Sequence, residues 1–373
     1  MNRTLAALSA VVFASIGLVR ADETAWTGEH VVDKPLRFVR AGLSVRPGTK
    51  VAFRGEGRII IENASFRAEG AFFEADSVLT NAFRIEVVGG RLDMSRCRVS
   101  GVKTHEPRKG RSFILGAFWS QYGNGSHLVG NDFRDSSAVT YANASDVVVQ
   151  GNLFLRAHGT GASLFHVVRP VVERNEFMTA TVDGLNLNVV EDANVMENRF
   201  TDCAVAINAR AAKTCCFSGN SVFGGGHGFS FRVDGGRNVV TGNLFERLKG
   251  FAVLGWMSFG GRTAFLNNLV VGSAGGFSFA EQPKTDAVAL CNNAVVESNV
   301  GYRLAGGEVR AMCNAAWRVK SPVEEKNGAA FRGMDLVTGD PMFRNAADGD
   351  YRIGKGSAWF SAGRCGVNIG LYQ

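Results

Sequence analysis

The chain has 373 residues, with 41 lysines and arginines against 34 aspartates and glutamates, which gives a formal net charge of +7. It has no dense cluster of basic residues, which argues against nucleic acid as a partner. A mild basic excess suits an anionic polymer, and an ordinary soluble surface with a slight excess accounts for it equally well.

Residues 1–21 are typical of a secretory signal peptide. Arg3 supplies the positive charge of the n-region, and Leu5 to Val19 form the apolar h-region. Val19 and Ala21 offer apolar or small residues at the positions that precede a signal peptidase cleavage site. An uncleaved anchor helix is the alternative, but the apolar run is short for a membrane span. Loss of Arg3 and Arg20 lowers the net charge from +7 to +5. We therefore expect a secreted or periplasmic protein without a membrane span after signal removal.

An asparagine followed two residues later by an apolar residue recurs through the middle of the chain. The steps between these asparagines are 21, 23, 23, 22, 23, 24 and 26 residues. A period of this length indicates a solenoid whose units bury their apolar faces only by stacking. The repeated asparagines are Asn131, Asn152, Asn175, Asn198, Asn220, Asn243, Asn267 and Asn293.

The sequence between these asparagines predicts strands rather than helices. Short runs of Val, Ile, Phe and Thr are broken by Gly, Asn and Asp. One period is long enough for a coil of three short strands, and successive coils would stack about 4.8 Å apart. Each asparagine then lies over the next, and its amide can donate a hydrogen bond to the turn of one neighbouring coil and accept one from the turn of the other. The residue two positions on points inward, which explains 27 phenylalanines against five tyrosines and five tryptophans.

On these features the chain resembles the right-handed parallel β-helix family, which has the pectate-lyase-like fold. The resemblance covers most of the chain. Residues 22–70 look like the N-terminal cap and opening coils, 71–320 like the main coils, and 321–373 like the closing segment of secreted bacterial members. It implies an all-β, single-stranded solenoid of about 22–24 residues per coil, with an internal asparagine ladder. We expect one elongated monomer. The fold alone implies no reaction.

Seven cysteines leave at least one without a partner in the chain. Cys291 and Cys313 lie 22 residues apart, which is one coil. Stacked positions at that spacing fall within the Cα range of a disulfide, so we expect this bond. Two buried, stacked thiols are the alternative.

A second strand can be aligned in each coil after the turn that follows the phenylalanine. Alternation predicts that ten of its residues point inward. These are Leu185, Val205, Phe229, Phe251 and Phe277, and then Leu187, Ile207, Phe231, Val253 and Phe279. The outward positions are polar over about three coils, then become small or apolar from Ala252 onward.

The resemblance implies that this strand lines a sugar groove. In the family the chemistry is β-elimination from a uronic acid, which needs a base for the C5 proton and a cation for the carboxylate. The catalytic candidates are Arg210 and Arg232, expected to be neighbours on successive coils, together with His227 and Lys249. Arginine can bind a carboxylate bidentately. The pKa of His227 or Lys249 is more easily shifted by the surroundings into the range that a base requires.

The same face supplies candidate ligands for sugar and metal. Asn186, Asn188, Asn208 and Asp234 are the substrate-binding candidates. Asp183 and Asp234 are weak Ca²⁺ candidates, since Ca²⁺ prefers six or more oxygens. The alternatives are a solvated charge ladder for the arginines and an outward hydrogen-bonded ladder for the asparagines.

We predict a secreted β-helix protein that acts as a polysaccharide lyase on an acidic glycan. A glycoside hydrolase is less well supported, because no pair of carboxylates with suitable spacing stands out. The alternative is a β-helix without catalysis, serving as a carbohydrate-binding or surface module.

Overall fold

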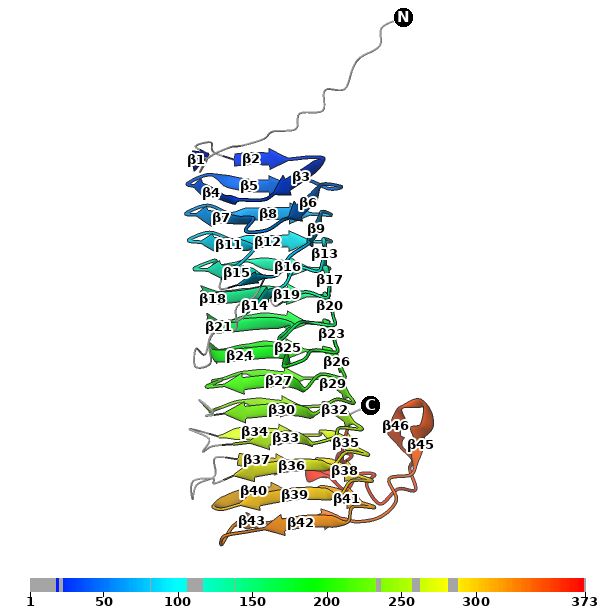
Figure 1. Ribbon diagram of the computed structural model, residues 1–373. Helices are drawn as coiled ribbons and strands as arrows, with labels where there is room; N and C mark the ends of the chain where they lie inside the picture. The colour runs from blue at the N-terminus through cyan, green and yellow to red at the C-terminus, as the bar shows by residue number, and fades with distance from the viewer. Residues whose placement is uncertain are drawn as a thin grey trace, which may run out of the picture.

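The structure is a computed structural model that describes residues 18–19, 23–80, 82–105, 117–137, 139–232, 236–256, 262–280 and 288–371. The chain winds into a stack of coils, each contributing one strand to each of three parallel sheets (Figure 1). Each sheet has 14 described strands, and we call them sheets A, B and C in the order that the chain visits them within a coil. The predicted all-β solenoid is therefore confirmed.

Sheet A contains, in spatial order, β1 (Leu18–Val19), β4 (Pro35–Val39), β7 (Arg58–Glu62), β11 (Ile85–Val88), β15 (Phe118–Gln121), β18 (Val139–Ser145), β21 (Ala162–Val168), β24 (Asp183–Glu191), β27 (Val205–Arg210), β30 (His227–Arg232), β33 (Phe251–Gly255), β36 (Gly275–Ala280), β39 (Val300–Ala305) and β42 (Ser321–Glu325).

Sheet B contains β2 (Glu23–Trp26), β5 (Gly42–Val45), β8 (Phe66–Glu69), β12 (Leu92–Ser95), β16 (His127–Val129), β19 (Val148–Gln150), β22 (Val171–Glu173), β25 (Asn194–Met196), β28 (Cys216–Ser218), β31 (Val239–Thr241), β34 (Thr263–Leu266), β37 (Val288–Cys291), β40 (Glu308–Met312) and β43 (Ala330–Arg332).

Sheet C contains β3 (Glu29–Val32), β6 (Lys50–Phe53), β9 (Phe72–Ala75), β13 (Arg98–Ser100), β17 (Asp132–Arg134), β20 (Leu153–Leu155), β23 (Glu176–Met178), β26 (Arg199–Thr201), β29 (Ser221–Phe223), β32 (Leu244–Glu246), β35 (Leu269–Val271), β38 (Ala294–Val296), β41 (Asn314–Trp317) and β44 (Leu336–Val337).

Two small pairs complete the secondary structure. Strands β10 (Leu79–Thr80) and β14 (Thr104–His105) are parallel, whereas β45 (Phe343–Asn345) and β46 (Asp350–Ile353) form an antiparallel pair. The described 3₁₀ turns are η1 (Ala346–Asp348) and η2 (Arg364–Gly366).

The asparagine ladder occupies the turn between sheets B and C. In a typical step, the Oδ1 atom of Asn198 accepts hydrogen bonds from the backbone nitrogen and Nδ2 of Asn175, at 3.0 and 2.9 Å. Its own Nδ2 donates to Asn220 at 3.0 Å and to the carbonyl of Val172 at 2.9 Å. Every polar atom of the buried amide is thus satisfied, as the repeat predicts.

The ladder differs from the sequence prediction at its C-terminal end. Asn243 donates to Asn268, and Asn268 donates to Asn293, so Asn268 is the ladder residue and Asn267 is not. Asn267 precedes the ladder residue in the left-handed region, with φ of 53°. The ladder then continues one further step, from Asn293 to Asn314.

Phenylalanines stack inside the coils beside the ladder. The rings of Phe133, Phe154, Phe177 and Phe200 lie nearly parallel, with successive centroids 5.1, 4.8 and 4.9 Å apart. All four are buried. The sequence prediction of an inward aromatic stack is confirmed over these coils.

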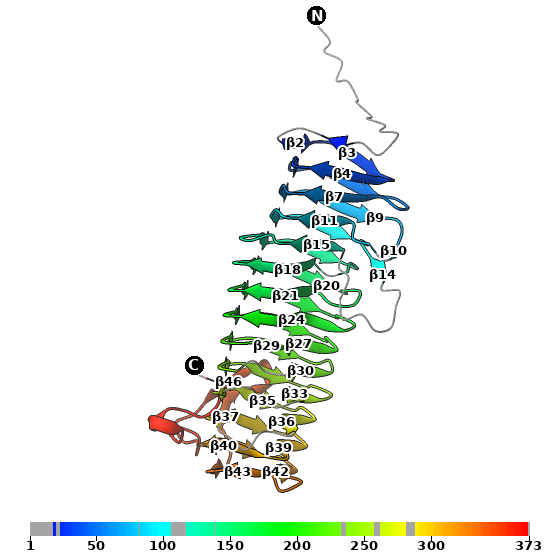
Figure 2. The ribbon, with the colours of Figure 1, turned by 90° about the vertical axis from the view of Figure 1, so that its left-hand side faces the viewer.

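The C-terminal segment folds back against the outer face of sheet C (Figures 1 and 2). Trp359, which is fully buried, packs with Tyr351 and Ile369 in one apolar cluster with Leu269 and Val296 of the sheet. The expected closing segment therefore covers a side of the solenoid, because residues such as Leu269 leave apolar surface outside the coil.

The last strand of sheet A carries groups that do not favour further pairing. Strand β42 contains Pro322, followed by Glu324 and Glu325. The Nε atom of Arg303 lies 2.7 Å from Oε2 of Glu324, which ties this strand to the preceding coil.

The expected disulfide is absent from the structure, in which Cys291 and Cys313 are both free thiols. Cys291 pairs with Met312 across sheet B, so Cys313 lies one position out of register. The reason is that this coil is 21 residues long, from Asn293 to Asn314, rather than 22.

The expected signal peptide falls almost entirely on residues outside the described part of the chain. In that part, no helix is long and apolar enough to cross a membrane.

We expect Asn198→Ala to lower the free energy of unfolding by about 2–4 kcal/mol, because it leaves buried donors of Asn175 without acceptors. Urea denaturation followed by circular dichroism measures this change. The exposed Asn194 of strand β25 provides the control, since Asn194→Ala should change stability by less than about 0.5 kcal/mol. Equal effects of the two substitutions would contradict a special role for the ladder.

Candidate functional site

The predicted polar face lies on the outside of sheet A, over strands β24, β27 and β30. One outward column of paired residues runs through Asn186, Asn208 and Ser230. The next outward column runs through Asn188, Arg210 and Arg232, each paired directly with the next. The prediction that Arg210 and Arg232 are neighbours on successive coils is confirmed.

The alignment from sequence was wrong by two residues in two coils. Ile207 and Val253, rather than Val205 and Phe251, occupy the inward column of Leu185 and Phe229. Val205 instead pairs with Asp183 and His227, at the start of the strands. Val205 and Phe251 are only partly buried, and the Arg303 guanidinium lies 4.8 Å from the centroid of the Phe251 ring, so the inward prediction is wrong for these two residues. The outward face was still identified because Asn208, Arg210 and Arg232 occupy their predicted outward positions.

Asp183 is the most deeply buried charged group of this face, with 3% of its surface exposed. Its Oδ2 atom accepts a hydrogen bond of 3.2 Å from Nδ2 of Asn208. Burial raises the pKa of Asp183 above its ordinary value, although the Asn208 bond and the charge of Arg232 act in the opposite direction. The carboxylate is therefore a stronger base than an exposed aspartate.

His227 begins strand β30 and is held against the next coil. Its Nδ1 atom lies 3.1 Å from the backbone nitrogen of Phe251, which can only donate. The neutral ring must therefore carry its proton on Nε2. Burial lowers the pKa of His227 below its ordinary value, which favours this neutral form. His227 thus presents an N–H group and not the free lone pair that a base requires.

The ring of His227 needs the glycine at position 250. A Cβ atom built on Gly250 would lie 2.3 Å from both Cε1 and Nδ1 of the imidazole. Such a separation is far below van der Waals contact. The role of Gly250 in seating the ring was not predicted from the sequence.

The cationic candidates are open to solvent. Arg210, Arg232 and Lys249 are exposed, and none forms an ion pair with a carboxylate in the described ranges. Lys249 lies in the turn before strand β33, at the same edge of the sheet as His227. Asp234, a candidate for both sugar and metal, lies outside the described residues.

The asparagines are partly engaged within the face itself. Asn186 donates from Nδ2 to the hydroxyl of Ser163 at 3.1 Å, and Asn208 bonds to Asp183. Asn188 is half-buried beside Arg210. Ser163 was not a predicted site residue, although it lies one coil earlier at the position equivalent to Asn186.

The expectation of Ca²⁺ rested on Asp183 and Asp234. Among the residues that the structure describes, no group of three or more His, Cys, Asp or Glu side chains is arranged to hold a metal ion. Asp183 supplies a single carboxyl group, one oxygen of which accepts a hydrogen bond from Asn208.

Comparison with known proteins supports the fold. The family described as "Right handed beta helix region" matches residues 137–300, which include the polar face. Comparison with curated protein sequences finds no match.

Solved structures with the same fold have very different sequences. A double mutant of the periplasmic alginate epimerase AlgG is 9% identical, with a TM-score of 0.54, and the match covers 83% of this chain and 78% of that chain. The catalytic domain of a GH87 alpha-1,3-glucanase in complex with nigerose is 10% identical, with a TM-score of 0.48 and coverage of 85% and 63%. PfbA, a surface adhesin of Streptococcus pneumoniae, is 10% identical, with a TM-score of 0.49 and coverage of 81% and 88%.

The chain therefore has the right-handed parallel β-helix fold, as its sequence repeat indicates. At 9% identity, the likeness to the AlgG double mutant shows the fold alone and leaves the activity to be argued from the site.

We expect His227 to be neutral at pH 7 with its proton on Nε2, which ¹⁵N NMR of the imidazole ring measures directly. The unfolded chain takes up a proton here near pH 6.5, above the pH at which the folded chain does so. The free energy of unfolding should therefore fall as the pH drops through that value, and His227→Gln should remove this component. A ring protonated on Nδ1 at neutral pH would contradict the assignment.

Gly250→Ala should displace the His227 ring, because the added methyl group occupies its position. The expected result is loss of the Nε2–H tautomer signature in the same NMR experiment. Gly151→Ala provides a control for adding a methyl group at a turn glycine, since a Cβ there meets no atom within 4 Å. An unchanged His227 spectrum in Gly250→Ala would show that the ring does not depend on this glycine.

Proposed function

We propose that this chain is an exported, carbohydrate-active protein that binds an acidic polysaccharide across the polar face of sheet A. The observation that carries the proposal is the pair Arg210 and Arg232, which are paired on adjacent strands and exposed without a described carboxylate partner. Two arginines on adjacent strands, whose backbones are about 4.8 Å apart, suit the carboxylates of a uronate polymer.

The size of the face also fits a short length of glycan. Strands β24, β27 and β30 place polar side chains over roughly 10–15 Å of the stack, which is about two or three sugar rings. Asn188 adds an amide beside the arginines. From strand β33 onward the equivalent outward positions include Leu254 and Ala280, which offer a sugar few polar contacts.

We propose that the reaction is β-elimination beginning with removal of the C5 proton of a uronate. Arg210 and Arg232 would neutralise the adjacent carboxylate, which stabilises the charge that develops when the proton leaves. Asp183 would accept the proton, since burial has raised the pKa of its carboxyl group. This replaces His227 as the base.

The remaining steps use the other two predicted catalytic residues. The electron pair from C5–H forms the C4–C5 double bond, and the bond from C4 to the glycosidic oxygen breaks. Lys249, an exposed ammonium group, would give a proton to the leaving oxygen. His227 would donate a hydrogen bond from Nε2 but keep its proton, because its Nδ1 already accepts from Phe251.

A binding module without catalysis is the second candidate. It is favoured by the internal hydrogen bonds of Asn186 with Ser163 and of Asn208 with Asp183, which satisfy part of the polar face without a ligand. Both candidates suit an exported protein, which the predicted signal peptide supports.

The decisive experiment incubates the chain in deuterated water with pectate, alginate or a glycosaminoglycan. A lyase generates an unsaturated sugar that absorbs in the ultraviolet, whereas an epimerase exchanges hydrogen at C5 without that product. Arg232→Gln should lower the rate at least about tenfold while leaving the fold unchanged. Binding without turnover would favour the module, and absence of both binding and turnover on all three polymers would exclude the proposal.

Asp183→Asn should abolish turnover and raise stability at pH 7. Asparagine retains an acceptor for Asn208 but removes the buried charge, which is the cause of the raised pKa of Asp183. Denaturation at pH 7 and at pH 3 measures the stability change, and the gain should shrink at the lower pH as the native carboxyl group becomes protonated. A destabilised but fully active Asp183→Asn chain would contradict the assignment.

A further inference from the structure

A surface cleft of about 430 Å³ lies on a different face, over sheet B near the N-terminal end of the stack. Strands β2, β5, β8, β12 and β16 contribute to its lining. The residues used below are Arg46, Arg67, Glu69, Asp93 and His127, all of which line the cleft. None of them belongs to the polar face of sheet A.

Four side chains form an outward column along the floor of this cleft. Ser44 pairs with Arg67, Arg67 with Asp93, and the register places His127 beside Asp93 on the next coil. Neighbouring members are therefore about 4.8 Å apart along the stack. The column continues with Val148 and Val171 on the following coils, so the charged stretch ends where the cleft ends.

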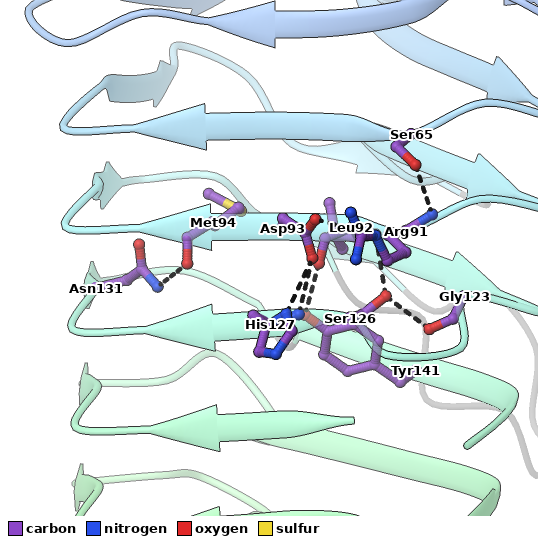
Figure 3. Close-up of polar contacts among 10 residues, drawn as sticks. All are labelled: Ser65, Arg91, Leu92, Asp93, Met94, Gly123, Ser126, His127, Asn131 and Tyr141. Carbon is purple, nitrogen blue, oxygen red and sulfur yellow. Dashed lines mark hydrogen bonds and ion pairs between the residues drawn. The ribbon is translucent and has the colours of Figure 1, made fainter. Parts of the chain in front are cut away.

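Asp93 is fully engaged and orients its neighbours (Figure 3). Its Oδ1 atom accepts a hydrogen bond of 3.0 Å from the backbone nitrogen of His127 and lies 3.6 Å from Nδ1 of the same residue. Its Oδ2 atom lies 3.4 Å from Nε of Arg91. With Nδ1 directed at the carboxylate, the Nε2 atom of His127 is left for a ligand.

The backbone beneath Asp93 is held from several sides, which fixes the position of the carboxylate (Figure 3). The backbone nitrogen of Leu92 donates to Ser126 at 3.1 Å, and its carbonyl accepts from the hydroxyl of Tyr141 at 3.3 Å. The carbonyl of Met94 accepts from the ladder residue Asn131 at 3.0 Å. A site on such a rigid support loses little freedom when a ligand binds.

Arg67 is exposed and forms no ion pair with any carboxylate in the described ranges, although it pairs with Asp93 across the sheet. Asp93 is bound instead by Arg91 and His127, and Glu69 forms an ion pair with Arg96. Arg46, also exposed, lines the cleft as well. Glu23 of strand β2 is a further exposed carboxylate of the lining. The cations that remain for a ligand are Arg67 and Arg46, and Nε2 of His127 adds a polar contact.

We propose that this cleft is a second carbohydrate site, in which Arg67 binds the carboxylate of an acidic sugar and His127 contacts a neighbouring hydroxyl. The choice of an acidic sugar rests on the proposed function, whereas the location of the site rests on the cleft itself. A volume of about 430 Å³ accommodates a short stretch of a glycan. A glycan held on sheet B as well as sheet A would wrap around the solenoid or join two chains.

The test is a calorimetric titration of the full chain with trigalacturonate, comparing Arg67→Gln, Arg232→Gln and Arg310→Gln with the unchanged protein. Arg310 is the matched control, since it is an exposed arginine in the same outward column of sheet B, far from the cleft. We expect two sites. Arg67→Gln should weaken one of them at least about tenfold, through loss of a charge-assisted hydrogen bond, and Arg310→Gln should weaken neither.

The outcomes separate this proposal from the proposed function. One site that is lost in Arg67→Gln but kept in Arg232→Gln would support the cleft and remove the sheet A assignment. One site that is lost only in Arg232→Gln would overturn the cleft and keep sheet A. An affinity unchanged in Arg67→Gln, an equal loss in Arg310→Gln, or no binding at all would each overturn the second site.

Discussion

The hydrogen bonds of the buried asparagine amides are the constraint on which the rest of this structure depends. The Oδ1 atom of each amide accepts hydrogen bonds from the asparagine of the preceding coil, and its Nδ2 atom donates to the asparagine of the next coil. A single coil with this turn would leave those groups without partners. The ladder fixes the register of the coils, and with it the columns of side chains on all three sheets. The polar face of sheet A is a consequence of that register, whereas the sheet B cleft lies on coils that precede Asn131, the first residue of the ladder.

Two sites on different sheets would differ in how their charges are held. On sheet A the acidic group Asp183 is buried and the arginines are exposed. The positive charge therefore lies at the surface, and burial raises the pKa of the Asp183 carboxyl group beneath it. On sheet B the acidic group Asp93 lies at the surface, where it contacts Arg91 and His127. The first arrangement suits proton transfer, whereas the second suits binding.

The repeat made the fold and the polar face predictable, and errors arose where a coil departed from the average length. Two adjacent asparagines made Asn267 and Asn268 equally good candidates, and only the hydrogen bonds distinguish them. Burial of Asp183 and the tautomer of His227 depend on contacts with the next coil, which spacing cannot reveal. The cleft on sheet B was missed because the coil from Cys97 to Asn131 is 34 residues long, which hides the alignment of Asp93 with His127.

A repeat that stacks on itself has no intrinsic length, so the open edge of its last coil could in principle recruit another chain. Here the final strand of sheet A contains Pro322, which lacks a backbone N–H, and two carboxylates at Glu324 and Glu325. A second chain that paired its first coil with this strand would lack one backbone hydrogen bond of the sheet, at Pro322, and would lie beside the negative charges of Glu324 and Glu325. Pro322 and its neighbours thus oppose end-to-end growth of sheet A beyond strand β42.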